Sequence, residues 1–275
     1  MTVEQTKGSI VLVGPGIMLG AHLTPRTRYY IETADIVFSC CSALVELWLK
    51  ELNPNLHSFD GLYAKGKHRR DTYNEMVEAM IGAVRDGKKV VSVFYGHPGV
   101  FAWAPHKVIA LAREEGYAAH MEPGISAADC LYADMGIDPG RVGSQHFETS
   151  QLMFYQRRID PAAYLFLWQP AIAGDLSISR FHTPGAYRQL LVELLLEQYP
   201  ADHQVALYEA AFLATETKRI EWLKLSDLPK ARMTLTTTLV IPPAVKLQRN
   251  EQMLAKLAAL DEQLALSSKQ EVVNA

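Results

Sequence analysis

The stretch "KKVVSVFYGHPGVFA", residues 88–102, decides which fold the sequence predicts. Its first half is a short apolar run, which is typical of a buried strand. Gly96, Pro98 and Gly99 then end the run in a sharp loop. The strand lies between two stretches with helical features, "RRDTYNEMVEAMIGAVRDG" before it and "APHKVIALAREEG" after it. This alternation indicates a mainly parallel sheet with helices on its faces.

The same alternation extends outward from residue 8 to residue 122. Thr24 is expected to be the N-cap of a helix, with Pro25 at its first position. We therefore expect an N-terminal α/β domain over residues 1–122. Its other strands are expected at 9–14, 35–41 and 118–122, and its other helices at 23–34 and 42–52.

The second half of the chain has a different pattern. The segment 218–225 alternates between apolar and polar residues in places, which suits an antiparallel strand with one face in water. We expect a C-terminal α/β domain with a mixed sheet over 123–243, followed by an amphipathic tail over 244–275. The other strands are expected at 162–169, 204–211 and 234–243, and a helix at 186–199. One side of the tail carries Met253, Leu254, Leu257 and Leu260.

Composition and charge exclude several functional classes. The 275 residues carry a net charge of −3 without a basic block, which argues against nucleic acid as the main partner. The three cysteines, two of them adjacent, suit a reducing cytoplasm. No CxxC or HExxH pattern points to a metal. The sequence has no signal peptide pattern and no apolar run near the roughly 18 residues of a membrane span.

Three loops rich in glycine or proline follow expected strands: "YGHPGVF", "EPGIS" and "WQPAIAG". Because open α/β sheets bind ligands at the carboxyl ends of their strands, these loops could line one cleft, with Ser126 and Gln169 as hydrogen-bonding groups. The alternative is three ordinary turns. Gly14 and Gly16 in "VGPG" fit either a ligand contact or a tight turn. The lack of GxGxxG makes a nicotinamide cofactor a weak hypothesis.

A second cluster of interest is "LYAKGKHRRDTY", residues 62–73. Arg69 and Tyr73 are four residues apart and share a face if the helix begins at Arg69. A capping box at Thr72 would instead leave Arg69 in the preceding turn. Tyr73 also fits the apolar stripe of its helix, so a plain core role is open, as is a surface turn for Tyr63.

The segment "VLVGPGIMLGAHLTPRTRYYIETADIVF" and the loops "YGHPGVF" and "PGISA" resemble the tetrapyrrole methylase superfamily over residues 8–243. The resemblance implies the two-domain class III methyltransferase fold, with S-adenosylmethionine in the cleft between the domains. Two departures argue against a tetrapyrrole substrate. Leu19 and His97 stand where porphyrin-type members carry aspartates.

"YGHPGVF", "RRDTY" and "TTTLVIPP" resemble the borosin α-N-methyltransferases, which methylate backbone amides of a ribosomally made peptide. The resemblance implies a homodimer. The chain ends 32 residues after Pro243, so we expect a split system whose separate precursor peptide carries a helical binding domain and a C-terminal core. A vestigial substrate in "EVVNA", residues 271–275, is the less favoured alternative. Two others remain open: a tetrapyrrole C-methyltransferase and an inactive peptide-binding module.

The borosin resemblance also assigns roles to residues. An amide nitrogen is a poor nucleophile, so its proton needs a base and its oxygen needs fixed donors. Arg69 and Tyr73 are expected to polarise the amide, with Tyr73 as the base and its phenolate favoured by Arg69. Tyr63 would assist, and Tyr95 would border the methyl donor. The catalytic positions are thus Tyr63, Arg69, Tyr73 and Tyr95. The cofactor-binding positions are Gly14, Gly16, Tyr95, His97, Val100, Phe101, Ser126, Ala127, Gln169, Ala210 and Thr238.

Overall fold

The computed structural model describes residues 7–273, and side-chain surroundings as far as residue 265. The first sheet has the strand order β3-β2-β4-β1-β5, and every neighbouring pair in it is parallel. This confirms the mainly parallel sheet expected from the alternation. Its strands are β1 (Ser9–Val13), β2 (Ile36–Cys40), β3 (Leu56–Ser58), β4 (Lys89–Phe94) and β5 (Ala118–Met121).

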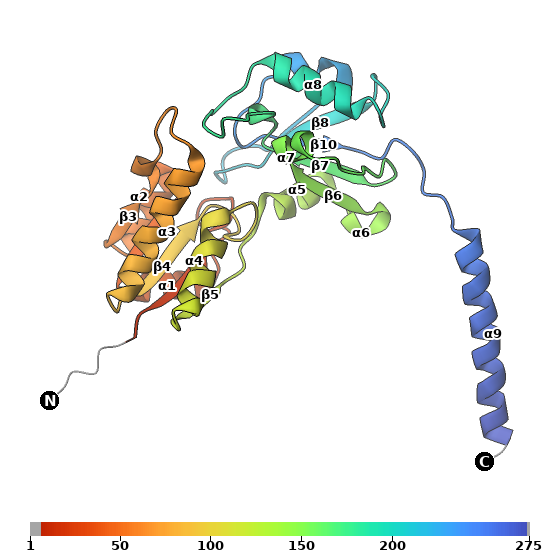
Figure 1. Cartoon of the computed structure of the whole chain (residues 1–275), viewed down its shortest axis with the longest axis horizontal. Helices are drawn as coiled ribbons and strands as arrows, with labels where there is room; N and C mark the ends of the chain where they lie inside the picture. The colour runs from red at the N-terminus through yellow and green to blue at the C-terminus, as the bar shows by residue number, and fades with distance from the viewer. Residues whose placement is uncertain (1–6, 274–275) are drawn as a thin grey trace.

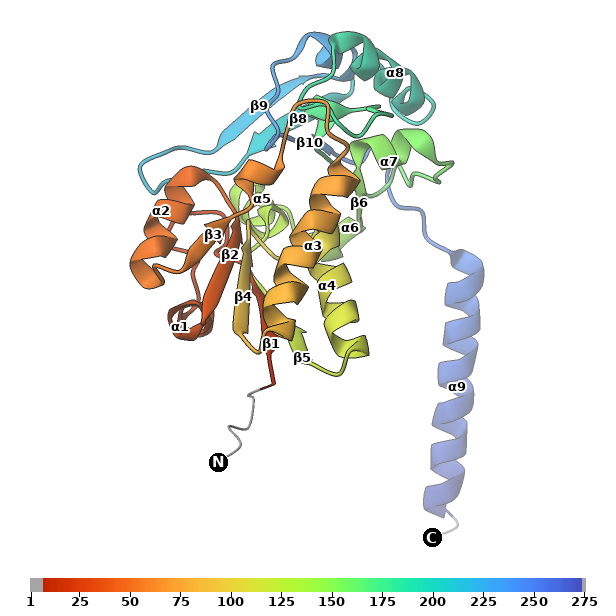
Figure 2. The ribbon, with the colours of Figure 1, turned by 60° about the vertical axis from the view of Figure 1, so that its left-hand side comes forward.

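Helices cover both faces of this sheet (Figures 1 and 2). They are α1 (Pro25–Thr33), α2 (Ala43–Leu52), α3 (Arg69–Arg85) and α4 (Trp103–Glu114). Successive residues of a strand point to opposite faces. Ile10 and Leu12 of β1 accordingly pack in the core under α3 and α4, whereas Val11 and Val13 pack in the core under α1 and α2.

Two helix starts test the expected capping. Thr24 caps α1, its Oγ1 accepting a hydrogen bond from the Thr27 N–H at 3.1 Å. This confirms the N-cap, with Pro25 in the first turn. Helix α3 begins at Arg69, and its N-cap is His68, whose Nδ1 accepts from the Arg70 N–H. The capping box at Thr72 is wrong, because that hydroxyl instead donates to the Leu62 carbonyl at 3.2 Å.

The second sheet has the order β6-β7-β10-β8-β9 and is mixed, as expected. Only β6 and β7 pair in parallel. The strands are β6 (Ser144–Glu148), β7 (Tyr164–Trp168), β8 (Gln204–Glu209), β9 (Arg219–Lys224) and β10 (Thr238–Ile241). The helices are α5 (Ala127–Met135), α6 (Pro139–Val142), α7 (Thr149–Phe154) and α8 (Gly185–Leu195). Short 3₁₀ turns lie at Asp60–Leu62, Pro170–Ile172 and Leu225–Lys230.

The strand expected over 234–243 is shorter than the prediction, because β10 begins only at Thr238. The Thr237 hydroxyl accepts from the Thr234 N–H at 2.8 Å, and the Thr234 hydroxyl accepts from the Thr236 N–H at 3.3 Å. Such local side-chain hydrogen bonds compete with strand pairing. Strands β3 and β6 were absent from the expectation because both are short and only partly apolar.

Helix α9 (Glu251–Val273) extends away from the two sheets (Figures 1 and 2). Its apolar stripe faces solvent, with Leu257 50% and Leu260 48% exposed. As far as Leu264, the large apolar side chains of α9 are thus not buried against the rest of this chain. The "EVVNA" segment lies partly outside the described residues. No helix within residues 7–273 combines the length and apolarity of a membrane span.

Candidate active site

A cavity of about 470 Å³ lies where strand ends of the two sheets meet. The first sheet contributes the carboxyl ends of β2 and β4, with Cys40 and Phe94 in the wall. The second sheet contributes a row across three strands, because Trp168 pairs with Glu148 of β6 on one side and with Thr238 of β10 on the other. All three line the cavity. Strand β10 runs antiparallel to β7, so its amino end lies beside the carboxyl end of β7.

Glycines allow close packing of the loops that follow the strands of the first sheet. Gly16 and Gly96 exchange two backbone hydrogen bonds of 3.2 and 3.1 Å. A Cβ on Gly14 would lie 2.0 Å from the Gly96 carbonyl oxygen, and one on Gly124 would lie 2.5 Å from the same atom. Close packing of backbones requires glycine at these positions. Gly14 and Gly16 thus support the cavity loop from behind and are not among the lining residues.

Three tyrosines project into the cavity. The hydroxyl of Tyr63 lies 3.7 Å from Sγ of Cys40, and the Tyr73 ring stacks on Trp103 at 6.5 Å between centroids. Burial raises the pKa of both Tyr63 and Tyr73. Tyr95 is 43% exposed, yet the protein around its hydroxyl raises its pKa to about 12. All three phenols are therefore protonated hydrogen-bond donors near neutral pH.

Arg69 lies beside this group but is not among the lining residues. Its backbone N–H donates to the Ile178 carbonyl at 3.0 Å, and its guanidinium donates to the Arg180 carbonyl. The guanidinium also lies 5.9 Å from the centre of the Phe181 ring. Its charge lowers the pKa of Tyr73, but desolvation is the larger effect and raises it. Arg69 therefore favours the Tyr73 phenolate, as expected, but burial outweighs this effect and leaves the pKa of Tyr73 raised.

The loop after β4 takes its shape from His97 and Phe101. Nδ1 of His97 accepts from the Gly99 N–H at 2.9 Å, which closes a tight turn. Phe101 in the loop after β4 and Gln169 after β7, which both line the cavity, have φ values of 51° and 57°. Residues other than glycine rarely adopt this left-handed conformation, and such strain concentrates at functional sites. The Phe101 ring lies 5.8 Å from the Trp168 ring, so the two halves of the wall approach each other there.

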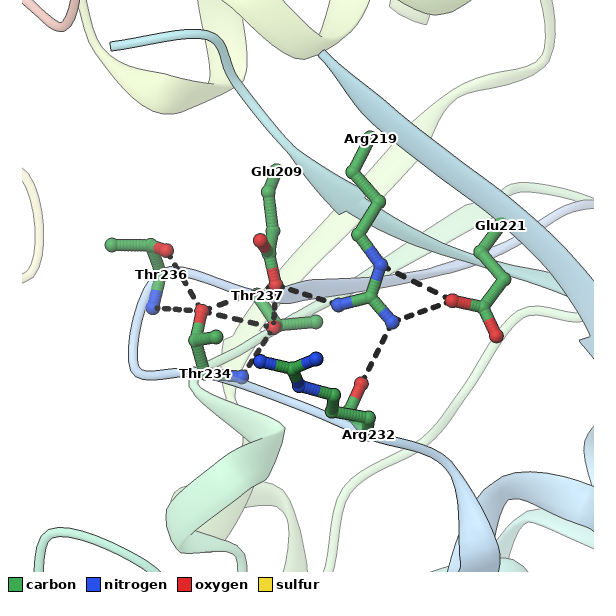
Figure 3. A network of polar contacts seen from close by, with 7 residues as sticks. All are labelled: Glu209, Arg219, Glu221, Arg232, Thr234, Thr236 and Thr237. Carbon is green, nitrogen blue, oxygen red and sulfur yellow. Dashed lines mark hydrogen bonds and ion pairs between the residues drawn. The ribbon is translucent and has the colours of Figure 1, made fainter. Parts of the chain in front are cut away.

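A polar network holds the cavity segment before β10 (Figure 3). The Glu209 carboxylate accepts from the hydroxyls of Thr237 and Thr234 and from Arg219, the last at 2.9 Å. The guanidinium of Arg219 also donates to the Arg232 carbonyl at 2.8 Å. Residues 235–238 line the cavity. The network therefore attaches this part of the cavity wall to β8 and β9.

The cavity brings most of the predicted site residues together. Those that line it are Tyr63, Tyr73, Tyr95, His97, Val100, Phe101, Ser126, Ala127, Gln169 and Thr238. Gly14, Gly16, Arg69 and Ala210 are not among the lining residues; Ala210 packs against a core of the second sheet. Sequence reasoning missed several lining residues, among them Cys40, Trp103, Glu148, Trp168 and Thr237. Trp168 had a detectable signal, since it lies within the predicted strand 162–169, directly before Gln169.

A cavity of small-molecule size at the strand ends of two sheets is typical of an α/β enzyme. Comparisons with known proteins identify its family. Residues 9–229 match the family model described as Tetrapyrrole (Corrin/Porphyrin) Methylases. The chain belongs to this family, and within it to the borosin methyltransferases. It is 37% identical over 270 residues to a methyltransferase/ribosomally synthesized type I borosin cyclic peptide precursor of Coprinopsis marcescibilis, covering 94% of this chain and 69% of that protein.

Two further relatives belong to the same group of precursor methyltransferases. The gymnopeptides precursor methyltransferase of Gymnopus fusipes is 37% identical, over 88% of this chain and 59% of that protein. The omphalotin A precursor methyltransferase of Omphalotus olearius is 36% identical, over 94% of this chain and 64% of that protein. The chain thus spans less than two thirds of the length of each of these two proteins.

Solved structures agree on the fold. Uroporphyrin-III-C-methyltransferase from Thermus thermophilus matches with a TM-score of 0.61 at 19% identity, over 87% of this chain and 94% of that one. A cobalt precorrin-4 methyltransferase matches with a TM-score of 0.63 at 16% identity, over 87% of this chain and 97% of that one. These identities establish the shared fold alone.

Proposed function

We propose that the protein transfers methyl groups from S-adenosylmethionine to backbone amide nitrogens of a ribosomally made precursor peptide. The observation that carries this proposal is the 37% identity with borosin precursor methyltransferases over 94% of the chain. A cavity lined by three tyrosines supports it. These relatives are named as methyltransferase and precursor peptide in one protein. A separate precursor for this chain stays a prediction.

The cavity fits S-adenosylmethionine in size and chemistry. Its volume of about 470 Å³ lies in the range of small-molecule sites. Its walls combine aromatic side chains with hydroxyl and amide groups. Bound there, the cofactor would supply an electrophilic methyl group. The residues that would hold it are His97, Val100, Phe101, Ser126, Ala127, Gln169 and Thr238, with Gly14 and Gly16 shaping the loop behind them and Ala210 supporting the second sheet.

The tyrosines supply the acid–base chemistry. Methylation of an amide requires loss of the N–H proton and stabilisation of charge on the amide oxygen. Tyr63 and Tyr95, protonated near neutral pH, suit donation to that oxygen. Tyr73 is the candidate base, because the charge of Arg69 is the main effect that opposes the burial of this phenol and so favours its deprotonated form. Arg69 also joins α3 to the segment 178–181, which holds its charge beside the tyrosines.

We further propose a homodimer to which α9 contributes. Five large apolar residues in the part of α9 whose side chains are described face solvent in the single chain: Met253, Leu254, Leu257, Leu260 and Leu264. A second subunit would cover this stripe and remove apolar surface from water.

Mass spectrometry tests the proposed reaction. The chain is co-expressed with a candidate precursor supplied as a separate peptide, beginning with any short open reading frame that neighbours its gene. Successive gains of one methyl mass, located on backbone amides by fragmentation, are the expected result. Calorimetry with S-adenosylhomocysteine tests the donor site independently of any peptide. A chain that methylates a porphyrinogen and no peptide would contradict the proposal, and a chain that binds no S-adenosylhomocysteine would remove the donor assignment.

A further inference from the structure

His146 of β6 links helix α5 to the wall of the cavity through two hydrogen bonds. Its Nε2 lies 2.7 Å from the hydroxyl oxygen of Tyr132, and its Nδ1 lies 3.2 Å from Nε1 of Trp168. The rings of His146 and Trp168 are also nearly parallel, with an interplanar angle of 14°. Trp168 is only 9% exposed, so its indole N–H depends on a protein partner.

These contacts define the protonation state of His146. An indole N–H can only donate, so Nδ1 of His146 must be the acceptor and carry no hydrogen. The proton of the neutral ring then resides on Nε2, which donates to the oxygen of Tyr132. Burial lowers the pKa of His146, which favours this neutral form. Protonation would place a hydrogen on Nδ1 and turn it toward the indole N–H, so that two donors faced each other.

Trp168 links the protonation state of His146 to the cavity, because Trp168 lines the cavity wall. Trp168 is the middle residue of the row formed with Glu148 and Thr238, and its ring approaches Phe101 from the other half of the wall. Gln169, the next residue, has the left-handed backbone conformation and also lines the cavity. A shift of the indole would therefore change both halves of the wall.

The groups around His146 include one titratable ring partner and one carboxylate on its own strand. The ring partners described for it are Tyr132 from α5 and Phe166 and Trp168 from β7. Tyr132 is the one titratable group among these three. On β6 itself, Glu148 is two residues away on the same face, and its carboxylate accepts from the Gln151 N–H at 2.8 Å.

We propose that His146 is a positioning residue whose neutral form holds the Trp168 indole in the cavity wall, so that the cavity binds the methyl-donor scaffold less tightly when His146 is protonated. The inference rests on the proposed function, because it takes the cavity to be the donor site. It assigns to His146 a role that acts through Trp168 and not on the reacting atoms.

The first measurement follows the indole N–H directly. The four tryptophans yield four indole N–H signals in a nitrogen–proton correlation spectrum, and Trp168→Phe identifies the signal of Trp168 by its loss. On lowering the pH from about 7.5 to about 5, that signal should shift with a midpoint below the ordinary histidine value of about 6.5. In His146→Asn, whose amide oxygen lies near the place of Nδ1 and does not titrate, the shift should disappear.

The second measurement is the affinity for S-adenosylhomocysteine by calorimetry over the same pH range. In the unaltered protein the affinity should fall by about tenfold at low pH, the effect of losing one buried hydrogen bond. The affinity of His146→Asn should stay constant with pH. His146→Phe, which keeps a ring but offers no acceptor, should bind weakly at every pH.

The two readouts separate the possible failures. A Trp168 signal that does not move, or that moves equally in His146→Asn, would overturn the inference. So would a signal that titrates while the affinity stays constant. A protein that binds no S-adenosylhomocysteine even at about pH 7.5 would instead contradict the donor site, since the spectrum reports the indole bond without any ligand.

Discussion

The thiol of Cys40 lies 3.7 Å from the hydroxyl of Tyr63, at the point where β2 opens into the cavity. Burial raises the pKa of Cys40, so the thiol stays protonated near neutral pH and can serve as a weak donor or acceptor for the phenol. The contact fixes the position of Tyr63, which comes from a loop and not from a helix or strand.

Replacement of Cys40 tests this contact. Cys40→Ala should reduce the rate of peptide methylation roughly three- to tenfold, as expected for one lost hydrogen bond of about 1 kcal/mol. Cys40→Ser, which keeps a hydrogen-bonding group, should retain more of the rate. Single-turnover kinetics measure the effect, and calorimetry should find the affinity for S-adenosylhomocysteine unchanged. Equal rates for all three proteins would show that Tyr63 needs no such support.

Arg69 should set the pH at which Tyr73 acts. The positive charge lowers the pKa of Tyr73, so Arg69→Met should raise that pKa. A base works in its deprotonated form, so less phenolate would be present at a given pH, and the alkaline rise in rate should move to higher pH. We expect a loss of about 10²-fold or more at neutral pH. Rate measurements over a pH series check this.

The neighbouring arginine supplies the control. Arg70 is exposed at the start of the same helix, so Arg70→Met removes an equal charge without touching the tyrosines. Its pH profile should match that of the unaltered protein. Arg69→Lys, which keeps the charge, should shift the profile less than Arg69→Met. A Tyr73→Phe variant with a normal rate would remove Tyr73 as the base.

Two glycines should respond to alanine in opposite directions. Gly14→Ala places a methyl group 2.0 Å from the Gly96 carbonyl oxygen, so it should destabilise the fold by about 1–3 kcal/mol and weaken binding of S-adenosylhomocysteine. Gly82 lies inside α3 with nothing within 4 Å of an added Cβ. Gly82→Ala should therefore stabilise the protein by about 0.5–1 kcal/mol. Urea denaturation measures both, and a neutral Gly14→Ala would contradict the close packing of the loops.

The network around Glu209 should hold the shape of the cavity. In Glu209→Gln the ion pair with Arg219 is lost and the segment 234–237 is held less firmly. We expect a several-fold weaker affinity for S-adenosylhomocysteine and a loss of stability of about 1 kcal/mol. Glu221→Gln is the matched control, because Glu221 pairs with the same arginine but its side chain is 52% exposed. Calorimetry that ranks the two variants equally would remove the role of Glu209.

The stripe on α9 should matter for assembly and not for folding of the single chain. Leu257 and Leu260 are about half exposed, so replacing both with lysine should change the free energy of unfolding of the monomer by no more than about 0.5 kcal/mol. The same change should weaken a dimer, measured by light scattering over a dilution series. Ala255→Lys with Ala259→Lys, on other faces of the helix, should leave the mass unchanged. A dimer unaffected by the leucine changes would exclude α9 from the interface.

Much of the fold follows from local patterns in the sequence. The alternation of helix and strand over 8–122 was sufficient to predict a parallel sheet, because the periods of 3.6 and 2 residues reflect which faces are buried. The cap at Thr24 was predictable for the same local reason. Short elements such as β3 and β6 were not, because three to five partly polar residues carry too little periodicity and are formed by pairing with neighbouring strands.

The site divides in a similar way. The sequence by itself determined that strand-end loops such as "YGHPGVFA" carry glycines and polar rings. Most of the residues selected through its resemblance to known families line the cavity. Only the tertiary structure decided that Glu148, Trp168 and Thr238 form one row, since strand register depends on pairing partners far apart in the chain. Only burial decided that the Tyr73 phenol stays protonated beside Arg69, because desolvation depends on the surrounding protein atoms and not on spacing along a helix.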